Sequence, residues 1–466
     1  MPEPPQGNGH SPPAEQNVSP TPHPPSPSSG RVDGTFFSEI RSTELEVLAM
    51  KTVCLTLCSI FLIGSIIAWV RSEPESPLQI LNDFESEIEV VVCSATSARN
   101  SSLRNAELVS NIVNGLSPKT HVLVLVNDRK AFQTRNPSER VTFIEVPPQK
   151  SISIWPQDPF VVVQSQNETQ LVVPCTFDRE DDQVMPTALG DRLGIEVVHS
   201  ELYFEGGDLV CDEEAVFTGM NTLQYNMELL QETSQSIVAR FEKTFGRPLI
   251  VVGKEQPSIA HIDLIVTPLG RGVIAVADSR PAASLVSQIR TTSPEEIQTF
   301  EQHCGKMFFG REDIMQIKNL SGNLIARPSL EHETHTAIQA SLEIAQELDD
   351  IASDFATRGY DVVRIPALIP ELKPELNSAG EEMPGYPMLT YNNVLLEERD
   401  GETIVYLPQY GLPALDVAAA KCWKELGYQV KTIPGFATSS MYGGSLRCCT
   451  KVLIRGAKKN PSDRSE

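Results

Sequence analysis

The sequence predicts an α/β protein in which one structural module is repeated about five times. Short apolar runs typical of strands alternate with amphipathic stretches typical of helices between residues 88 and 453. The order strand, strand, helix, strand recurs with a spacing of roughly 60 residues. This repeat favours a single architecture of related modules over two unrelated domains.

The elements of the modules can be located along the chain from these apolar patterns. Strands are predicted at 88–94, 121–126, 141–147, 160–165, 170–177, 202–211, 215–222, 249–253, 261–268, 272–278, 361–366, 393–398, 403–409 and 429–434. Helices are predicted at 104–115, 187–193, 226–245, 334–357 and 413–426. Residues 302–329 fit the repeat least well, and we interpret them as an insertion.

Charge and composition narrow the classes of function. The chain of 466 residues has a net charge of -23, so it offers no basic face that could follow nucleic-acid phosphates. The same charge suits positively charged small substrates or basic partners. A hydrophobic content of 40% is enough for a sizeable core.

The N-terminal region differs from the repeats in composition. Residues 1–50 are predicted to be a disordered, Pro- and Ser-rich tail, because such a segment buries too little apolar surface to offset its ordering entropy. The uncharged stretch Thr52–Val70 follows, and in helical form it is long enough to cross a ~30 Å hydrocarbon core. We therefore predict one transmembrane helix at 51–71 and a catalytic domain at 85–457.

Basic residues on the two sides of this span indicate its orientation. Arg31, Arg41 and Lys51 precede the span, whereas Arg71 alone follows it closely. Because basic residues favour the cytoplasmic side, the sequence predicts a single-pass membrane protein with an extracytoplasmic catalytic domain.

The nine cysteines show no spacing typical of a metal site, so neither a metal nor an organic cofactor is predicted. Cys54 and Cys58 lie in the predicted span, and the others are odd in number. At least one thiol would therefore stay free even in an oxidising compartment. The others are Cys93, Cys175, Cys211, Cys304, Cys422, Cys448 and Cys449.

The segment from Tyr442 to Thr450 holds the candidate nucleophile. Gly443 and Gly444 allow a sharp turn or a close approach to a ligand, and Cys448 and Cys449 follow them. A thiolate is a strong nucleophile, so a cysteine after such a turn is a catalytic candidate. The alternative is a buried cysteine pair that packs in the core.

Three further groups of polar residues stand at predicted strand ends. Asp158 lies in a turn whose backbone is restricted by neighbouring prolines, and Glu205 and Asp208 flank a Gly-Gly turn. His261 and Asp263 are two residues apart, so on a strand both side chains would face the same way. Each group alone has a structural explanation, but together with a thiol they form the inventory of an active site.

In this order, the motifs Asp158-Pro-Phe, Glu205-Gly-Gly-Asp208, His261-x-Asp263 and Gly443-Gly-x-x-x-Cys448 resemble those of the pentein superfamily of guanidine-modifying enzymes. That superfamily includes arginine, agmatine and peptidyl-arginine deiminases and amidinotransferases. The resemblance covers about residues 85–455. It implies a propeller of five ββαβ modules around a pseudo-fivefold axis, with one site on that axis.

The chemistry of such a site follows from the residue types. A guanidinium is a planar cation with forked donors, best held by carboxylates. Cys448 would attack its central carbon, and His261 would protonate the departing amine and then activate water. Asp263 would hold guanidinium nitrogens, with Glu205 among the binding residues. By similarity, the opposing carboxylate would be Asp158 or Asp208, which leaves the branch of the superfamily open.

Counted from Gly443 and Gly444, the resemblance to the superfamily implies Cys448 as the nucleophile, and on a strand Cys449 would point to the opposite face. Several positions depart from the pattern of the superfamily. Gln157 stands where many relatives carry Arg, so no salt bridge is expected to orient Asp158. Arg447 precedes the cysteine where His is common, and Tyr442 stands where some arginine deiminases carry an Arg. The Tyr391–Asn393 turn is a candidate for shaping the pocket.

Three functional hypotheses remain open at this point. The leading hypothesis is a membrane-anchored deiminase that converts a guanidino group to a ureido group with release of ammonia. Its substrate would be agmatine, arginine or peptidyl-arginine. The alternatives are an amidinotransferase and a non-catalytic guanidine-binding or interaction protein, the last motivated by Gln157 and Arg447. The oligomeric state is not predicted.

Overall fold

The computed structural model describes most of the chain after residue 76. The described residues are 77–95, 102–127, 129, 139–150, 152–165, 168–309, 316–318, 324–326, 330–371, 375–376, 382–383 and 386–456. The chain divides into two units after Pro74, and every described residue lies in the second unit. The predicted tail at 1–50 and transmembrane helix at 51–71 lie outside the described residues. Among the helices that are described, none is both long and apolar enough to cross a membrane.

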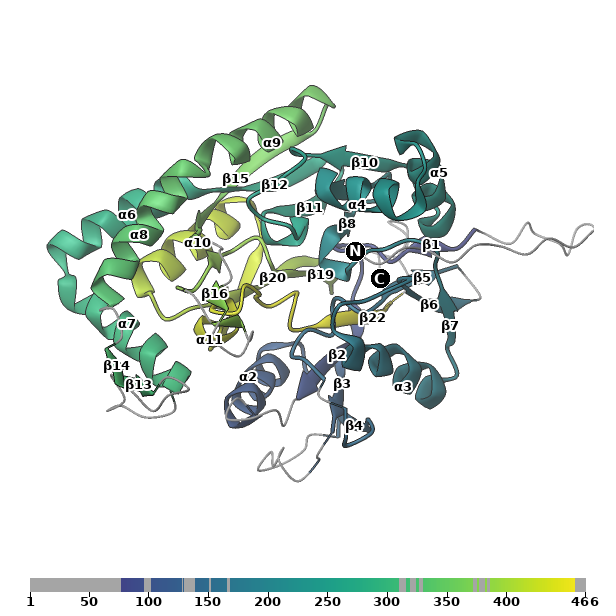
Figure 1. Ribbon diagram of the computed structural model, residues 1–466, viewed down its shortest axis with the longest axis horizontal. Coiled ribbons are helices and arrows are strands. Elements are labelled where there is room, and N and C mark those ends of the chain that lie inside the picture. Colours follow the sequence, from purple (N-terminus) through teal and green to yellow (C-terminus); the bar gives the residue numbers. More distant parts are fainter. Residues whose placement is uncertain are drawn as a thin grey trace, which may run out of the picture. The chain divides into compact units, whose positions relative to one another are not determined.

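Four modules repeat the predicted order of strand, strand, helix and strand (Figure 1). In each, the first two strands are antiparallel and the last strand runs parallel to the second. The smaller two are β5 (Val161–Gln164), β6 (Thr169–Val173), α3 (Val184–Leu193) and β7 (Glu196–His199), and β19 (Leu395–Arg399), β20 (Glu402–Gln409), α10 (Pro413–Glu425) and β21 (Gln429–Pro434). The larger two are β8 (Leu209–Cys211), β9 (Val216–Gly219), α4 (Met220–Leu230), α5 (Ser234–Phe245) and β10 (Leu249–Val252), and β11 (Val266–Gly270), β12 (Val273–Asp278), α6–α9 and β15 (Asp361–Leu368).

The remaining module combines the two ends of the described chain. β2 (Ile88–Ala95), α2 (Ser102–Gly115) and β3 (His121–Val126) form its parallel part, and β4 (Val141–Glu145) extends the sheet. β22 (Lys451–Arg455) pairs antiparallel with β2 and takes the place of the first strand. The five-module repeat predicted from sequence is therefore confirmed as five sheets of three or four strands.

Short elements extend these sheets or connect them. β1 (Gln79–Ile80) pairs with β5, and β18 (Leu389–Thr390) pairs with β15. Hairpins are formed by β13 (Gln316–Lys318) with β14 (Leu324–Ala326) and by β16 (Glu375–Leu376) with β17 (Glu382–Met383). The remaining short helices are α11 (Ala437–Ser440) and the 3₁₀ turns η1 (Glu180–Gln183), η2 (Gly206–Asp208) and η3 (Ile262–Leu264).

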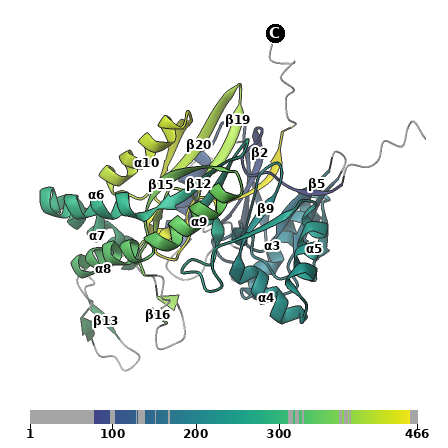
Figure 2. The ribbon, with the colours of Figure 1, turned by 90° about the horizontal axis from the view of Figure 1, so that it is seen from above.

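The crossover between β12 and β15 is the longest in the molecule. It contains α6 (Ser279–Thr292), α7 (Pro294–Phe309), α8 (Leu330–Glu343) and α9 (Ala345–Thr357). Helices α6, α7 and α8 pack against one another, and Figures 1 and 2 both draw them together at one end of the unit. The predicted insertion at 302–329 corresponds to the end of α7 and the β13–β14 hairpin.

Four sequence predictions of local structure are wrong. Of the strand predicted at 202–211, only 209–211 forms β8, because the Gly-Gly pair folds into the 3₁₀ turn η2 directly before it. The helix predicted at 226–245 is two helices, because Gln231 adopts a φ of 53° at the end of α4 and Thr233 caps the start of α5. The helix predicted at 334–357 is likewise divided between α8 and α9. Residues 261–264 are not a strand, since His261 precedes the 3₁₀ turn η3 and the strand begins at Val266.

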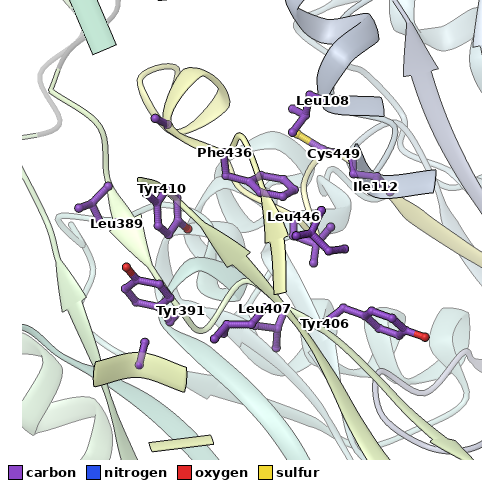
Figure 3. Packing of buried hydrophobic residues seen from close by; sticks show 14 of the residues in the cluster. Leu108, Ile112, Leu389, Tyr391, Tyr406, Leu407, Tyr410, Phe436, Leu446 and Cys449 are labelled. Carbon is purple, nitrogen blue, oxygen red and sulfur yellow. The ribbon is translucent and has the colours of Figure 1, made fainter. Parts of the chain in front are cut away.

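The largest hydrophobic cluster among the described residues includes Tyr391, the first residue of the Tyr391–Asn393 turn (Figure 3). The rings of Tyr391 and Tyr410 meet edge to face, with centroids 5.2 Å apart. The buried Trp423 donates a hydrogen bond from Nε1 to the backbone oxygen of Tyr391, at 3.1 Å. Rigid aromatic packing of this kind fixes the backbone that carries Asn393.

Candidate active site

The candidate site residues lie in five loops, and each loop leads into the first strand of one module. This shared location explains how positions far apart in sequence come together. The loop before β5 carries Asp158, that before β8 carries Glu205 and Asp208, that before β11 carries His261 and Asp263, that before β19 carries Asn393, and that before β22 carries Cys448.

Two adjacent glycines allow the loop before β8 to approach its neighbours. A Cβ on Gly207 would lie 2.5 Å from Nδ1 of His261, and a Cβ on Gly206 would overlap the backbone oxygen of Gln157. The side-chain amide of Gln157 also donates to the oxygen of Gly206, at 3.0 Å. The Gly-Gly pair of the Glu205–Asp208 motif is therefore required by close packing.

His261 is paired with a carboxylate. Its Nε2 lies 2.8 Å from Oε2 of Glu205. Burial alone would lower the pKa of His261, but the hydrogen bond to Glu205 and the charges of Asp158 and Asp208 raise it well above its usual value. The raised pKa favours the protonated imidazole, which is the form that a general acid requires.

Asp158 is held by an arginine that the sequence did not reveal. Its Oδ2 lies 2.7 Å from the guanidinium of Arg179, which also contacts Asp182 and lies 3.7 Å from Oε2 of Glu205. The expectation that no salt bridge orients Asp158 is thus wrong, because Arg179 supplies one where Gln157 cannot. Burial, opposed by the positive charges of His261 and Arg179, raises the pKa of Asp158 to about 7.

Asp263 is held in a similar way by the residue before the candidate nucleophile. Its Oδ2 lies 2.8 Å from the guanidinium of Arg447 and 3.9 Å from Sγ of Cys448. Arg447 is fixed in turn by Asp83, whose Oδ1 lies 2.9 Å from its second terminal nitrogen. The position that departs from the pattern of the superfamily therefore contacts a predicted substrate-binding acid directly.

In Asp158 and Asp263, an arginine binds Oδ2 but not the second carboxylate oxygen, Oδ1. Oδ1 of Asp158 and Oδ1 of Asp263 are both buried, and neither has a hydrogen-bond partner within the described part of the chain. A buried acceptor without a donor is costly, and in native proteins it often marks a place where a ligand binds. The two carboxylates thus present one free oxygen each.

Cys448 lies among these acids in a buried turn rather than on a strand. Its backbone N–H donates to Oδ1 of Asn393 at 3.1 Å, and Nδ2 of Asn393 donates to the backbone oxygen of Asp263 at 3.2 Å. Asn393 therefore ties the nucleophile loop to the loop before β11. Burial, together with the charges of Asp263 and Asp158, raises the pKa of the Cys448 thiol well above its usual value.

Cys449 points elsewhere. It belongs to the large hydrophobic cluster, and Figure 3 shows it beside Leu108 and Ile112. Cys448 belongs to a different cluster, beside Asp263. The two cysteines thus have different surroundings, as strand alternation predicted, although the segment is a turn.

Asp208 has a structural position. Its Oδ2 accepts the backbone N–H of Glu205 at 2.9 Å, which closes a capping box across η2. Burial raises the pKa of Asp208 to about 6, and His261 opposes this effect. Its carboxylate holds the turn that carries Glu205.

One ligand atom each from Asp158, Glu205 and His261 lie within 4.8 Å of one another, a spacing that could also hold a metal ion. The guanidinium of Arg179 already contacts Asp158 and lies near Glu205. Arg179 thus already brings positive charge to two of these three side chains.

Similarity to known structures supports the fold. No protein-family model matches the chain, and no curated protein is similar enough in sequence to match. The structure is similar to C. jejuni agmatine deiminase, with 15% identity, a TM-score of 0.51, and coverage of 81% of this chain and 96% of that enzyme. It is also similar to the agmatine deiminase of Enterococcus faecalis, with 12% identity, a TM-score of 0.52, and coverage of 81% and 96%. The chain therefore has the fold of the agmatine deiminases, which is the fold of the pentein superfamily.

Proposed function

We propose that this protein is a deiminase that hydrolyses a guanidino group to a ureido group and releases ammonia. The observation that carries the proposal is the pair of free, buried oxygens on Asp158 and Asp263. Both acids are close enough to Cys448 to raise the pKa of its thiol. A guanidinium supplies what they lack, a planar cation with N–H donors on more than one side.

The two arginines that flank the site support this binding mode. Arg179 forms an ion pair with Oδ2 of Asp158, and Arg447 forms one with Oδ2 of Asp263. Each arginine fixes the orientation of its carboxylate and leaves Oδ1 for the substrate. Asp158, rather than Asp208, is thus the acid proposed to oppose Asp263, because Asp208 is engaged in the turn before β8.

The reaction proceeds in two halves. The thiolate of Cys448 attacks the central carbon of the guanidinium, and His261 donates its proton to the departing nitrogen, so ammonia leaves and a thiouronium remains. His261, now neutral, takes a proton from water, whose oxygen attacks the same carbon. The C–S bond then breaks, the hydroxyl proton passes to the departing sulfur and restores the thiol, and the neutral ureido product leaves. Over the cycle, one water enters and one ammonia departs.

Binding of the substrate also activates the thiol. In the free protein, burial and two nearby carboxylates keep Cys448 protonated. A bound guanidinium places positive charge against the same carboxylates, which lowers the pKa of the thiol. The nucleophile would therefore form mainly when a cationic substrate is present, and the buried thiol would stay unreactive otherwise.

The substrate class follows from this chemistry and from similarity. Several structural neighbours are agmatine deiminases, and one is a putative peptidyl-arginine deiminase, so agmatine is the first candidate, followed by arginine and peptidyl-arginine. We propose that the five modules surround one pseudo-fivefold axis with the site at its end. We further propose that the Thr52–Val70 segment anchors this domain to a membrane, with the domain on the extracytoplasmic side.

Ammonia release by the purified full-length chain tests the activity. Agmatine, free arginine, and peptides with internal or C-terminal arginine would be offered without any amine acceptor, which distinguishes hydrolysis from amidino transfer. Release from one of them, absent in Cys448→Ala, is the expected result. Failure to release ammonia from all four by a folded protein would contradict the proposed activity.

A further inference from the structure

A second polar cavity lies beside the candidate active site. It has a volume of about 40 Å³, and the polar side chains that line its wall are those of Asn82, Asp83, Gln157, Arg447, Lys451 and Arg455. The rest of its lining comes mainly from apolar residues of β5, β19 and β22 and of the segment around β1. The candidate nucleophile, its histidine and the two substrate-binding acids do not line it.

Lys451 is buried in this wall with little to balance its charge. The residue is 5% exposed, and its Nζ donates one hydrogen bond, to the backbone oxygen of Gln157 at 3.0 Å. The ammonium also lies 5.2 Å from the centroid of the Phe160 ring. Within the described residues, no carboxylate lies within salt-bridge distance of Nζ.

Arg455 also carries a buried charge that no described carboxylate balances directly. The residue is 8% exposed, and its terminal nitrogens donate to the backbone oxygens of Asp83, Glu85, Ser86 and Leu396. Its Nε is buried without a hydrogen-bond partner, and no described carboxylate forms a salt bridge with its guanidinium. An arginine does not lose its proton inside a protein, so this charge persists.

The acid on the cavity wall does not neutralise these two cations. Asp83 binds Nε of Arg447 at 3.1 Å and its terminal nitrogen at 2.9 Å through Oδ1, and its Oδ2 accepts the backbone N–H of Cys211 at 2.9 Å. Arg447 is thus matched by Asp83 and Asp263, whereas Lys451 and Arg455 have no direct counter-ion. Buried charges without a partner are strongly unfavourable.

We propose that this cavity binds a small monovalent anion of the size of chloride, held by Lys451 and Arg455. The space is large enough for this class of ligand, because one water-sized probe needs only about 10–15 Å³ of such volume. Gluconate is a much larger anion than chloride, so it serves as the comparison anion. The proposed anion site is independent of the proposed catalytic activity, since it uses neither Cys448 nor His261.

Anion binding would depend on pH through Lys451. Burial and the charge of Arg447 lower the pKa of Lys451 to about 7, and Asp158, Asp83 and Asp263 oppose this effect. Below that pH the ammonium is charged and attracts an anion. Above it the amine becomes neutral, and Arg455 alone remains to hold the ion. Chloride should therefore bind more tightly near pH 6 than near pH 9.

Thermal unfolding of the full-length protein tests the proposal. At about pH 6 and equal ionic strength, sodium chloride should give a higher Tm than sodium gluconate, by about 2 °C or more at saturation. The chloride-dependent difference should shrink near pH 9 and vanish in Lys451→Met. It should persist in Lys421→Met, which alters a lysine whose side chain is 74% exposed. Equal differences in Lys451→Met and Lys421→Met would overturn the proposal.

A direct measurement covers the case in which Lys451→Met does not fold. Crystals of the unchanged protein would be soaked in bromide, which scatters X-rays anomalously. An anomalous peak between Nζ of Lys451 and the guanidinium of Arg455 is the expected result. Bromide peaks confined to the surface, with none in this cavity, would contradict the site.

Discussion

The buried carboxylate of Glu397 and the buried carboxylates of Asp158 and Asp263 each face an arginine, but they differ in how their oxygens are satisfied. Oε1 of Glu397 accepts from the Tyr406 hydroxyl at 2.5 Å, and Oε2 accepts from the backbone N–H of Ile88 at 3.0 Å. Arg399 contacts both oxygens. Every oxygen of this acid therefore has a donor.

At the candidate active site, by contrast, one oxygen of each acid is satisfied by Arg179 or Arg447 and the other is left without a donor. Both regions bury charge at a cost in desolvation. Around Glu397, hydrogen bonds inside the protein offset that cost, so its role is to hold β19 against β2. At the candidate site the cost is left partly unmet, and a ligand can offset it.

Removal of the nucleophile should have the largest effect. We expect Cys448→Ala to lower kcat by about 10⁴-fold or more, because no other group in the site can form the covalent adduct. Cys449→Ala should retain most activity, since its thiol packs beside Leu108 and Ile112. Steady-state ammonia release measures both. Loss of activity in Cys449→Ala with Cys448→Ala still active would reverse the assignment.

Replacing a carboxylate by the corresponding amide should distinguish an acid that binds the substrate, Asp263, from one that stabilises the fold, Glu397. Asp263→Asn should lower kcat/KM by roughly 10²- to 10³-fold, because a donor replaces an acceptor that faces the substrate. Glu397→Gln should instead lower the free energy of unfolding by about 2 kcal/mol, since Arg399 loses one of its two carboxylate partners and keeps only Glu87. Kinetics and denaturant unfolding of both variants check this. If Glu397→Gln impairs kcat/KM as strongly as Asp263→Asn, the division between binding and structural acids is wrong.

A methyl group next to the general acid should have a smaller effect. In Gly207→Ala the new Cβ would lie 2.5 Å from Nδ1 of His261, so the ring must move. A shift of this size should lower kcat by roughly 10- to 100-fold with the fold retained. Gly219→Ala is the matched control, because its φ of -75° suits alanine and its Cβ would meet the end of the Asn221 side chain. Equal kcat values for the two variants would show that the position of His261 is not critical.

The smallest effect concerns the stability cost of the ionised Asp158. Burial raises the pKa of this group to about 7, above its value in the unfolded chain. Because the folded state binds this proton more tightly than the unfolded chain does, protonated Asp158 contributes to the free energy of unfolding. That contribution is complete at a pH below the pKa of the group in the unfolded chain, and it is lost as the pH rises through about 7. Asp158→Asn should therefore unfold a few degrees above the unchanged protein near pH 8, with the difference disappearing near pH 4. A Tm difference that does not change with pH would contradict the raised pKa.

The repeating strands and helices could be predicted from sequence because buried strands require apolar runs and amphipathic helices require their periodicity. The Gly-rich motifs at Glu205 and Cys448 were also visible, since close approach of backbone and ligand needs residues without Cβ. The strand assigned to His261–Asp263 failed because apolar residues at 262, 264 and 265 also suit a buried 3₁₀ turn.

The arginines of the site could not be assigned from sequence. Arg179 stands between Asp178 and Glu180 in a run of charges that looks like an ordinary solvated loop. Its ion pair with Asp158 forms only when two loops fold together, and the periodicity of the local sequence does not predict that contact. Arg447 was noticed only as a departure from the pattern of the superfamily, whereas its contacts with Asp263 and Asp83 give it a specific role.

The pairing of β2 with β22 has a consequence for synthesis of the protein. Ile88 in β2 lies opposite Arg455 in β22, so the first sheet to emerge from the ribosome cannot be completed until the last strand appears. At 5–20 residues per second, that interval is roughly 20 to 70 s. Cys448 lies directly before β22, so the thiol reaches its carboxylate partners only after this strand has been synthesised. An incomplete chain would therefore have no assembled active site.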